Sequence, residues 1–181
     1  NYIDTKTNEQ SLQFKRGTAK LIIFFMLGIS SVLGLYLAYL TDVIVFLVGG
    51  LCFLCGIFYT YGPVPISRQP LGEIMSGLFY GLLIPFILLH INMPEGTFVT
   101  LSLSLKAIGI TLQVKQILIL MLFAILPICT TSNIMLANNI CDLEKDIKVK
   151  RHTLPYYLGD QSLDLFAGLY YLAYASLAVM I

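Results

Sequence analysis

Long apolar stretches alternate with short polar segments along this chain. A helix needs about 20 residues to cross the hydrocarbon core of a bilayer. Five apolar stretches reach or approach that length, at residues 18–40, 43–59, 74–91, 117–137 and 163–181. They are apolar on all sides rather than at alternate positions, which argues against a membrane β-barrel. The pattern predicts an all-α fold, a polytopic transmembrane helical bundle. We expect no strands, and we expect residues 98–113 to form a surface-lying helix or a partly inserted loop.

The composition supports a location in the lipid bilayer. Hydrophobic residues make up 57% of the chain and charged residues 12%, whereas soluble domains carry about 25% charged residues. This excludes a cytosolic enzyme and a disordered tail, and a net charge of +1 gives no basic footprint for nucleic acid. No signal peptide is visible after Asn1, and the sequence stops inside an apolar run at Ile181. We therefore expect one membrane-embedded domain over residues 1–181, truncated at both ends.

The basic residues predict the orientation of the five spans. Loops that carry more Lys and Arg remain in the cytoplasm. The N-terminal segment and the loops 61–73 and 141–160 fall on one side, and the opposite side has only Lys106 and Lys115. The basic residues of the first side are Lys6, Lys15, Arg16, Lys20, Arg68, Lys145, Lys148, Lys150 and Arg151. We expect that side to face the cytoplasm, with the protein in the inner or plasma membrane.

A polar pattern occurs twice on the side predicted to be cytoplasmic. The first copy has Asn1, Asp4 and Asn8, and the second has Asn139, Asp142 and Asp146 at the same spacing. Four predicted spans, an even number, separate the copies, so both lie on the same side. The repeat suggests two halves of a single site.

The residue types of the repeat favour a divalent cation. Asn138, Asp142 and Asp146 follow one another every four residues, which places them on one face of a helix that continues from the fourth span. Mg²⁺ prefers oxygen ligands and commonly binds through one or two carboxylates and substrate phosphates. We predict that Asp4 and Asn8 complete the metal ligands, and that Lys145, Lys150 and Arg151 contact phosphate.

The second copy also carries a family resemblance. Residues 138–146, followed by Lys150, Arg151, His152 and Gly159, resemble the second aspartate-rich motif of the UbiA superfamily of intramembrane prenyltransferases. Residues 1–8 resemble the first motif of that family, with Asn8 where many members have Asp. The resemblance implies a nine-helix bundle of which this chain holds five spans. It also implies Mg²⁺ as cofactor, with Asp4, Asp142 and Asp146 as catalytic residues and Asn139 as a substrate-binding residue.

The loop before the third span resembles one branch of the family. Residues 59–73 are similar to a loop of the 1,4-dihydroxy-2-naphthoate polyprenyltransferases of menaquinone biosynthesis. The resemblance implies that Tyr59 is catalytic and that Tyr61 and Arg68 bind substrate. From the residues alone, Tyr59 and Tyr61 also fit an interfacial aromatic belt and Arg68 a topology signal. Glu73 fits either a role in the site or stabilisation of a helix N-terminus.

The implied reaction transfers a polyprenyl group from polyprenyl diphosphate to 1,4-dihydroxy-2-naphthoate, with loss of carbon dioxide. The partners are then the two substrates and the lipid bilayer, and the oligomeric state stays open. One alternative is a related prenyltransferase with another acceptor, such as a hydroxybenzoate, haem or chlorophyllide. Another is a transporter, although transporters place ionisable residues near the membrane midplane and these acids gather at one end of the spans. We expect residues 1–181 alone to be inactive, because the resemblance implies four further helices.

Overall fold

A computed structural model of the chain describes residues 15–61, 65–104 and 106–181. Asp4 and Asn8, the predicted residues of the first motif, lie outside the described residues. The chain divides into two compact units, residues 1–50 and 51–181. The prediction of one domain over residues 1–181 stays a prediction.

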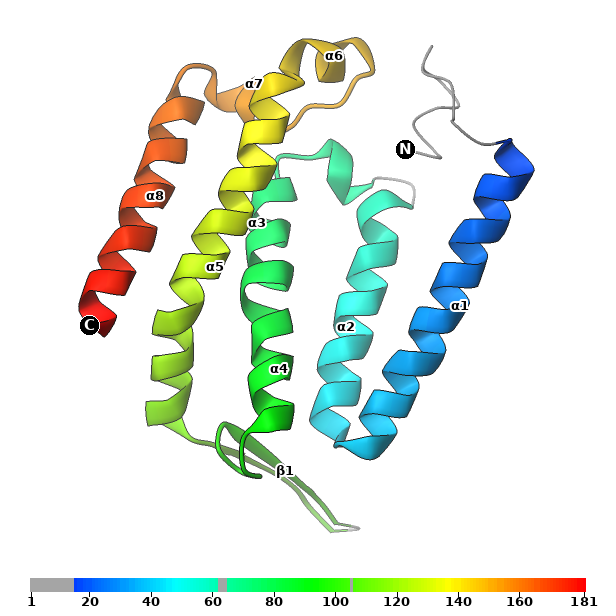
Figure 1. Ribbon diagram of the computed structural model, residues 1–181, viewed down its shortest axis with the longest axis vertical. Coiled ribbons are helices and arrows are strands. Elements are labelled where there is room, and N and C mark those ends of the chain that lie inside the picture. The colour runs from blue at the N-terminus through cyan, green and yellow to red at the C-terminus, as the bar shows by residue number, and fades with distance from the viewer. Residues whose placement is uncertain (1–14, 62–64, 105) are drawn as a thin grey trace. The chain divides into compact units, whose positions relative to one another are not determined.

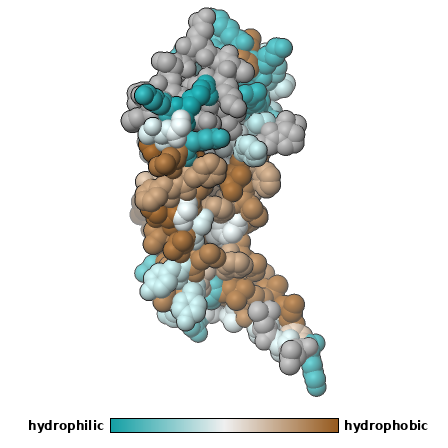
Figure 2. All heavy atoms as spheres, turned by 90° about the vertical axis from the view of Figure 1, so that its right-hand side faces the viewer, coloured by the Kyte–Doolittle hydropathy of each residue, from teal (hydrophilic) through white to brown (hydrophobic). Residues whose placement is uncertain are grey.

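The first unit contains α1, Arg16–Leu40, and the start of α2, Val43–Thr60. No residue of α1 is buried. Figure 2 shows mostly hydrophobic side chains over the middle of the face that is turned toward the viewer. A surface of this kind suits lipid rather than water. Two residues separate the two helices. The Asp42 carboxylate accepts a 2.9 Å hydrogen bond from the Val45 amide and so caps the start of α2.

The second unit holds the end of α2 and all later elements (Figure 1). Their bounds are η2 Ile66–Arg68, α3 Gly72–Ser76, η3 Gly77–Leu83, α4 Ile84–Asn92, β1 Val99–Leu103, β2 Ile108–Leu112, α5 Val114–Cys141, α6 Leu143–Lys148, α7 Leu154–Leu158 and α8 Gln161–Met180. The elements α3, η3 and α4 run on as one rod, Gly72–Asn92. In this unit the strands lie at one end of the long helices, and α6 and α7 lie at the other (Figure 1).

Five helices of the described chain are long and apolar enough to cross a membrane. They are Arg16–Leu40, Val43–Thr60, Gly72–Asn92, Val114–Cys141 and Gln161–Met180. Each coincides with one predicted span, and the bounds differ by at most four residues. The predicted all-α fold is therefore confirmed. Hydropathy predicts these elements well because the bilayer fixes both the length and the polarity of a spanning helix.

The expectation for residues 98–113 was wrong. This stretch forms an antiparallel hairpin in which Val99 pairs with Leu112 and Leu103 with Ile108. In β1, apolar residues alternate with Thr100 and Ser102, the two-residue period of a strand. The pairing matters little to the class of the fold, but it shows that strands are present.

The long helix α5 lies at the centre of the second unit, with α3 and η3 packed on one side and α8 on another. Gly77 and Gly81 allow the close approach to α5. A Cβ atom at Gly81 would overlap the backbone of Ile128 and Pro127. Small residues four apart are a common way to bring membrane helices together. On the side of α8, the buried Asn133 donates a 3.0 Å hydrogen bond to the carbonyl of Phe166.

Candidate functional site

The second motif lies where α5 ends and α6 begins. The continuous helix that we expected for Asn138, Asp142 and Asp146 was wrong, because α5 ends at Cys141 and a turn at Asp142 precedes α6. The amides of Asp142 and Asp146 still bond to carbonyls four residues earlier, those of Asn138 and Asp142. The side chains have different environments, however: Asn138 and Asp142 are exposed and Asp146 is buried.

A polar seam joins α5 to the start of α3. The Ser132 hydroxyl donates a 2.9 Å hydrogen bond to the backbone carbonyl of Glu73. Two helical turns further along the same face of α5, the Asn139 amide donates a 2.8 Å bond to the Glu73 carboxylate. Both Asn139 and Glu73 are buried. Glu73 therefore points into the contact with α5, and the predicted substrate-binding residue Asn139 is its partner.

Arg151 connects the second motif to the loop before α3. Its Nε donates a 2.8 Å hydrogen bond to the carbonyl of Ser67, and one Nη donates a 3.4 Å bond to the side-chain oxygen of Asn139. Its other Nη lies 3.6 Å from a carboxylate oxygen of Asp146. The planar guanidinium suits such a role, because it presents several donors in a fixed fork.

Local backbone chemistry places Arg151 over Asp146. At the end of α6, the amide of Lys150 bonds to the carbonyl of Ile147, and the amide of Arg151 bonds to that of Asp146. These two bonds form a Schellman motif, in which the residue after the helix takes a left-handed conformation. That residue is Lys150, with φ of 57°. The motif reverses the chain, so that Arg151 returns to the end of α5.

The remaining predicted residues of the second motif form an exposed layer. The Lys145 ammonium donates a 2.8 Å hydrogen bond to the Asp142 carboxylate, and this bond raises the pKa of Lys145. Asn138 and Lys150 are exposed as well. The motif thus has an inner layer of Asn139, Asp146 and Arg151 and an outer layer that a substrate in water or at the membrane surface can reach.

The aromatic residues of the loop region lie in two different environments. The hydroxyl of Tyr59, near the end of α2, lies 3.9 Å from the sulfur of Met135 on α5. A Cβ atom at Gly72 would lie 3.4 Å from the same hydroxyl and 3.7 Å from the side-chain nitrogen of Asn139, so Tyr59 lies beside the polar seam. Tyr61 is exposed, and Arg68 is partly buried in η2.

Two residues that take part in the hydrogen bonds of the candidate site, Ser67 and Glu73, were not assigned a site role from the sequence. Ser67 contributes only its backbone carbonyl, which no sequence pattern marks. Glu73 was left between two roles, although it is the only Asp, Glu, Lys or Arg in the Gly72–Asn92 span. An ionisable residue in a membrane helix is usually functional, and this signal favours a role in the site.

The side-chain oxygens of the second motif suit a hard cation such as Mg²⁺ as ligands. Asn138, Asp142 and Asp146 offer an amide oxygen and carboxylate oxygens, the ligand type that Mg²⁺ prefers. The described residues contain no group of three or more His, Cys, Asp or Glu side chains that could hold a metal alone. The other predicted ligands, Asp4 and Asn8, lie outside the described residues.

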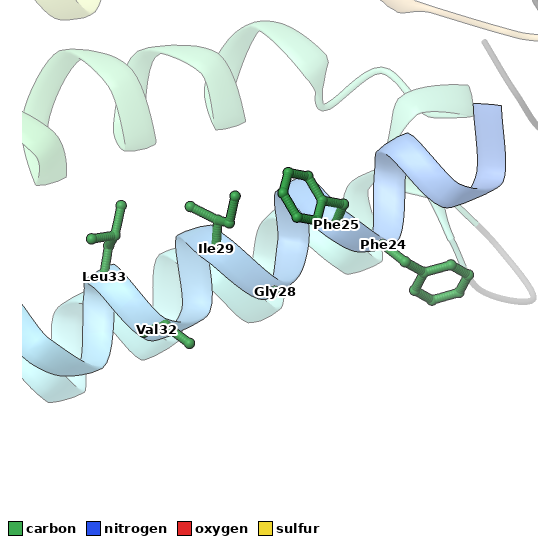
Figure 3. A pocket seen from close by; sticks show the side chains of 6 residues that line it. All are labelled: Phe24, Phe25, Gly28, Ile29, Val32 and Leu33. Carbon is green, nitrogen blue, oxygen red and sulfur yellow. The ribbon is translucent and has the colours of Figure 1, made fainter. Parts of the chain in front are cut away.

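A separate hollow lies on the surface of α1 (Figure 3). It has a volume of about 460 Å³ and is lined by Phe24, Phe25, Gly28, Ile29, Val32 and Leu33. Phe25, Ile29 and Leu33 point to one side of the helix and Phe24 and Val32 to the other, with Gly28 between them. The lining offers no hydrogen-bonding or ionisable side chain, so we do not assign catalytic chemistry to it.

Similarity to known proteins identifies the family of this chain. The chain is 32% identical over 148 residues to the 1,4-dihydroxy-2-naphthoate octaprenyltransferase of Bacillus subtilis (strain 168). The aligned part covers 81% of this chain and 41% of the relative, so the chain spans about two fifths of that protein's length. No solved structure matches the chain. The UbiA prenyltransferase family matches residues 12–181, which is nearly the whole chain. The chain therefore belongs to the UbiA prenyltransferase family.

Proposed function

We propose that this chain is part of a Mg²⁺-dependent enzyme of menaquinone biosynthesis. The enzyme transfers a polyprenyl group from polyprenyl diphosphate to 1,4-dihydroxy-2-naphthoate, with loss of carbon dioxide. The observation that carries the proposal is the polar network at the end of α5. Asn139, Arg151 and Asp146 of the second motif are joined to one another and to the loop before α3. Family membership supports prenyl transfer, and the name of the Bacillus subtilis relative supports the acceptor.

The exposed layer binds the diphosphate of the donor. Lys145 and Lys150 supply positive charge at the surface of the motif, and the exposed carboxylate of Asp142 lies beside Lys145. We propose that Asn138, Asp142 and Asp146 hold Mg²⁺ together with Asp4 and Asn8. When bound, the ion neutralises charge on the departing diphosphate and makes it a better leaving group.

The bonds and electrons of the reaction balance without a further reactant. The carbon–oxygen bond of the donor breaks, and its electron pair leaves with the diphosphate. The ring carbon that bears the carboxylate forms a bond to the allylic carbon, and the carboxylate then leaves as carbon dioxide, which restores the aromatic ring. The face of Tyr59 can stabilise the allylic cation. The apolar helices of the second unit exclude water that would trap that cation.

We further propose that the motifs face the cytoplasm and that Arg68 binds the carboxylate of the acceptor. Nine of the eleven basic residues lie on the predicted cytoplasmic side, which supports the orientation. Arg68 lies in η2, one residue from the Ser67 carbonyl that accepts a bond from Arg151. Arg68 therefore lies next to the hydrogen bond between Arg151 and Ser67, although Arg68 itself is not part of the second motif.

The acceptor is tested by product identification. Membranes that contain the full-length protein, of which this chain is a part, are incubated with Mg²⁺, a polyprenyl diphosphate and one aromatic acid from a panel. We expect 1,4-dihydroxy-2-naphthoate to give a prenylated product whose mass lacks the carboxylate. A product with hydroxybenzoate alone would assign the chain to another branch of the family. Absence of any prenylated product would contradict the proposal.

A further inference from the structure

Glu73 is a buried carboxylate at the second position of α3. Its exposed fraction is 4%. One carboxylate oxygen accepts the hydrogen bond from Asn139, and the other is buried without a hydrogen-bond partner among the described residues. Burying a carboxylate costs free energy unless the group is compensated. A residue that only stabilises the N-terminus of α3 would gain the same benefit at the surface, so its burial against α5 needs another explanation.

The hydrogen bond to Glu73 fixes the orientation of the Asn139 amide. An ionised carboxylate only accepts hydrogen bonds, so the side-chain NH₂ group of Asn139 has to face Glu73. The oxygen of the amide then faces Arg151, which donates to it at 3.4 Å. Without Glu73 the amide can turn over, and its NH₂ group would then meet the guanidinium of Arg151, donor against donor. Glu73 thus prevents a wrong orientation of Asn139.

The orientation of Asn139 affects the predicted metal ligand Asp146. Arg151 has three protein acceptors, Ser67, Asn139 and Asp146. If the bond to Asn139 is lost, only Ser67 and Asp146 still hold the guanidinium, which can then shift relative to Asp146. The carboxylate of Asp146 is buried, so its direction depends on the groups packed around it.

We propose that Glu73 is a positioning residue, which sets the orientation of Asn139 and through it the arrangement of Arg151 and Asp146 at the diphosphate site. This inference rests on the proposed function, because it assigns the network to binding of the donor. Glu73 acts through Asn139 and does not itself contact either substrate.

The first test compares kinetic constants of variants in the membrane-embedded protein. Glu73→Ala should raise the KM for polyprenyl diphosphate at least about tenfold, the size of one lost hydrogen bond to a charged group. The KM for the aromatic acceptor should change less than about twofold, because Asn139, Arg151 and Asp146 are proposed to act in the binding of the polyprenyl diphosphate. Glu73→Gln keeps one acceptor oxygen and should recover most of the donor affinity. The control is Glu95→Ala, at an exposed position in the turn before β1, which should leave both constants unchanged.

Equal constants for Glu73→Ala and the unchanged protein, with only a lower unfolding temperature, would overturn the inference and leave a structural role. If Glu73→Ala does not fold, the inference is tested with Glu73→Gln, with Asn139→Asp and with the double variant that combines them. Asn139→Asp places two carboxylates against each other and should lower the unfolding temperature and raise the donor KM. Adding Glu73→Gln restores a donor–acceptor pair, so the double variant should recover much of both losses. Failure of the double variant to recover either quantity would contradict the inference.

The same measurements distinguish a failure of the proposed function from a failure of the inference about Glu73. If the unchanged protein transfers no prenyl group to any acceptor, the proposed function fails, and the positioning role at a diphosphate site fails with it. If the unchanged protein is active and the Glu73 variants behave like Glu95→Ala, only the inference fails.

Discussion

The backbone carbonyl of Ser67 accepts a 2.8 Å hydrogen bond from Nε of Arg151, a residue 84 positions later in the chain. Since the other guanidinium nitrogens approach Asn139 and Asp146, three protein groups engage the side chain that the sequence assigned to phosphate binding. Arg151 therefore ties the loop before α3 to the second motif. Its charge still contributes to the potential at the site, but its donors are directed to the protein.

The first prediction concerns the shape of this side chain. Arg151→Lys keeps the charge and loses the fork of donors, so it cannot reach all three acceptors. We expect the unfolding temperature in detergent to fall by roughly 2–4 °C, which corresponds to about 1 kcal/mol in a chain of this size. Lys148→Ala, at an exposed position in α6, serves as the control. Equal unfolding temperatures for the two variants would show that the bond to Ser67 contributes little.

The two acidic residues of the second motif should behave differently when removed. Asp142 is exposed and pairs with the exposed Lys145, so Asp142→Ala should leave the unfolding temperature unchanged. Asp146 is buried beside Arg151, so Asp146→Ala should lower that temperature by several degrees. Both variants should lose prenyl transfer by about a hundredfold or more, because each removes a proposed ligand of Mg²⁺.

Turnover and thermal unfolding are measured on the same preparations of these two variants. Near-normal turnover in both would remove the pair from the metal site. A loss of stability in Asp142→Ala as large as in Asp146→Ala would contradict the division into an exposed and a buried layer.

A third prediction separates the charge of Lys150 from its backbone conformation. Lys150 has φ of 57°, which costs a residue with a side chain about 1 kcal/mol or more. Lys150→Gly should therefore raise the free energy of unfolding by about 0.5–1 kcal/mol. It should also raise the KM for the diphosphate donor, because the proposed contact of Lys150 with phosphate is lost. Lys148→Gly, in the last turn of α6, should instead destabilise the protein, and similar effects of the two changes would contradict the assignment of the turn.

A fourth prediction tests the contact between η3 and α5. Gly81→Ala would push a methyl group into the backbone of Ile128 and Pro127, and we expect a loss of at least about 2 kcal/mol. At Gly168 in α8, nothing in the described chain lies within 4 Å of an added Cβ. Gly168→Ala should thus be neutral or slightly stabilising. The unfolding temperatures of the two variants test this prediction. An equal change in both would mean that the contact between η3 and α5 does not depend on Gly81.

The fold can be predicted from the sequence more fully than the site can. The five long helices follow from hydropathy, because each one is determined by its own residues and the bilayer. The hairpin was missed because two strands of five residues give a weak local signal beside the strong signal of the spans. The break at Asp142 was missed because a four-residue spacing also fits an uninterrupted helix.

The contacts within the candidate site depend on distant parts of the chain. Asn139 could be predicted as a site residue from its motif, but its partner Glu73 lies 66 positions away. Ser67 contributes a backbone carbonyl, whose position follows from the path of the loop and not from the identity of the side chain. The residue types of the second motif were therefore predictable, whereas the division into a buried network and an exposed layer was not.

The central claim is that the two motifs meet over one diphosphate. It is tested by the distance between spin labels at Thr7 and Glu144, beside the first and second motifs, in a protein whose four native cysteines are replaced. We expect a separation well below the roughly 30 Å thickness of the hydrocarbon core, and a narrower distance distribution when Mg²⁺ and an unreactive diphosphate analogue are added. A separation equal to or greater than that thickness, unchanged by Mg²⁺ and the analogue, would contradict it.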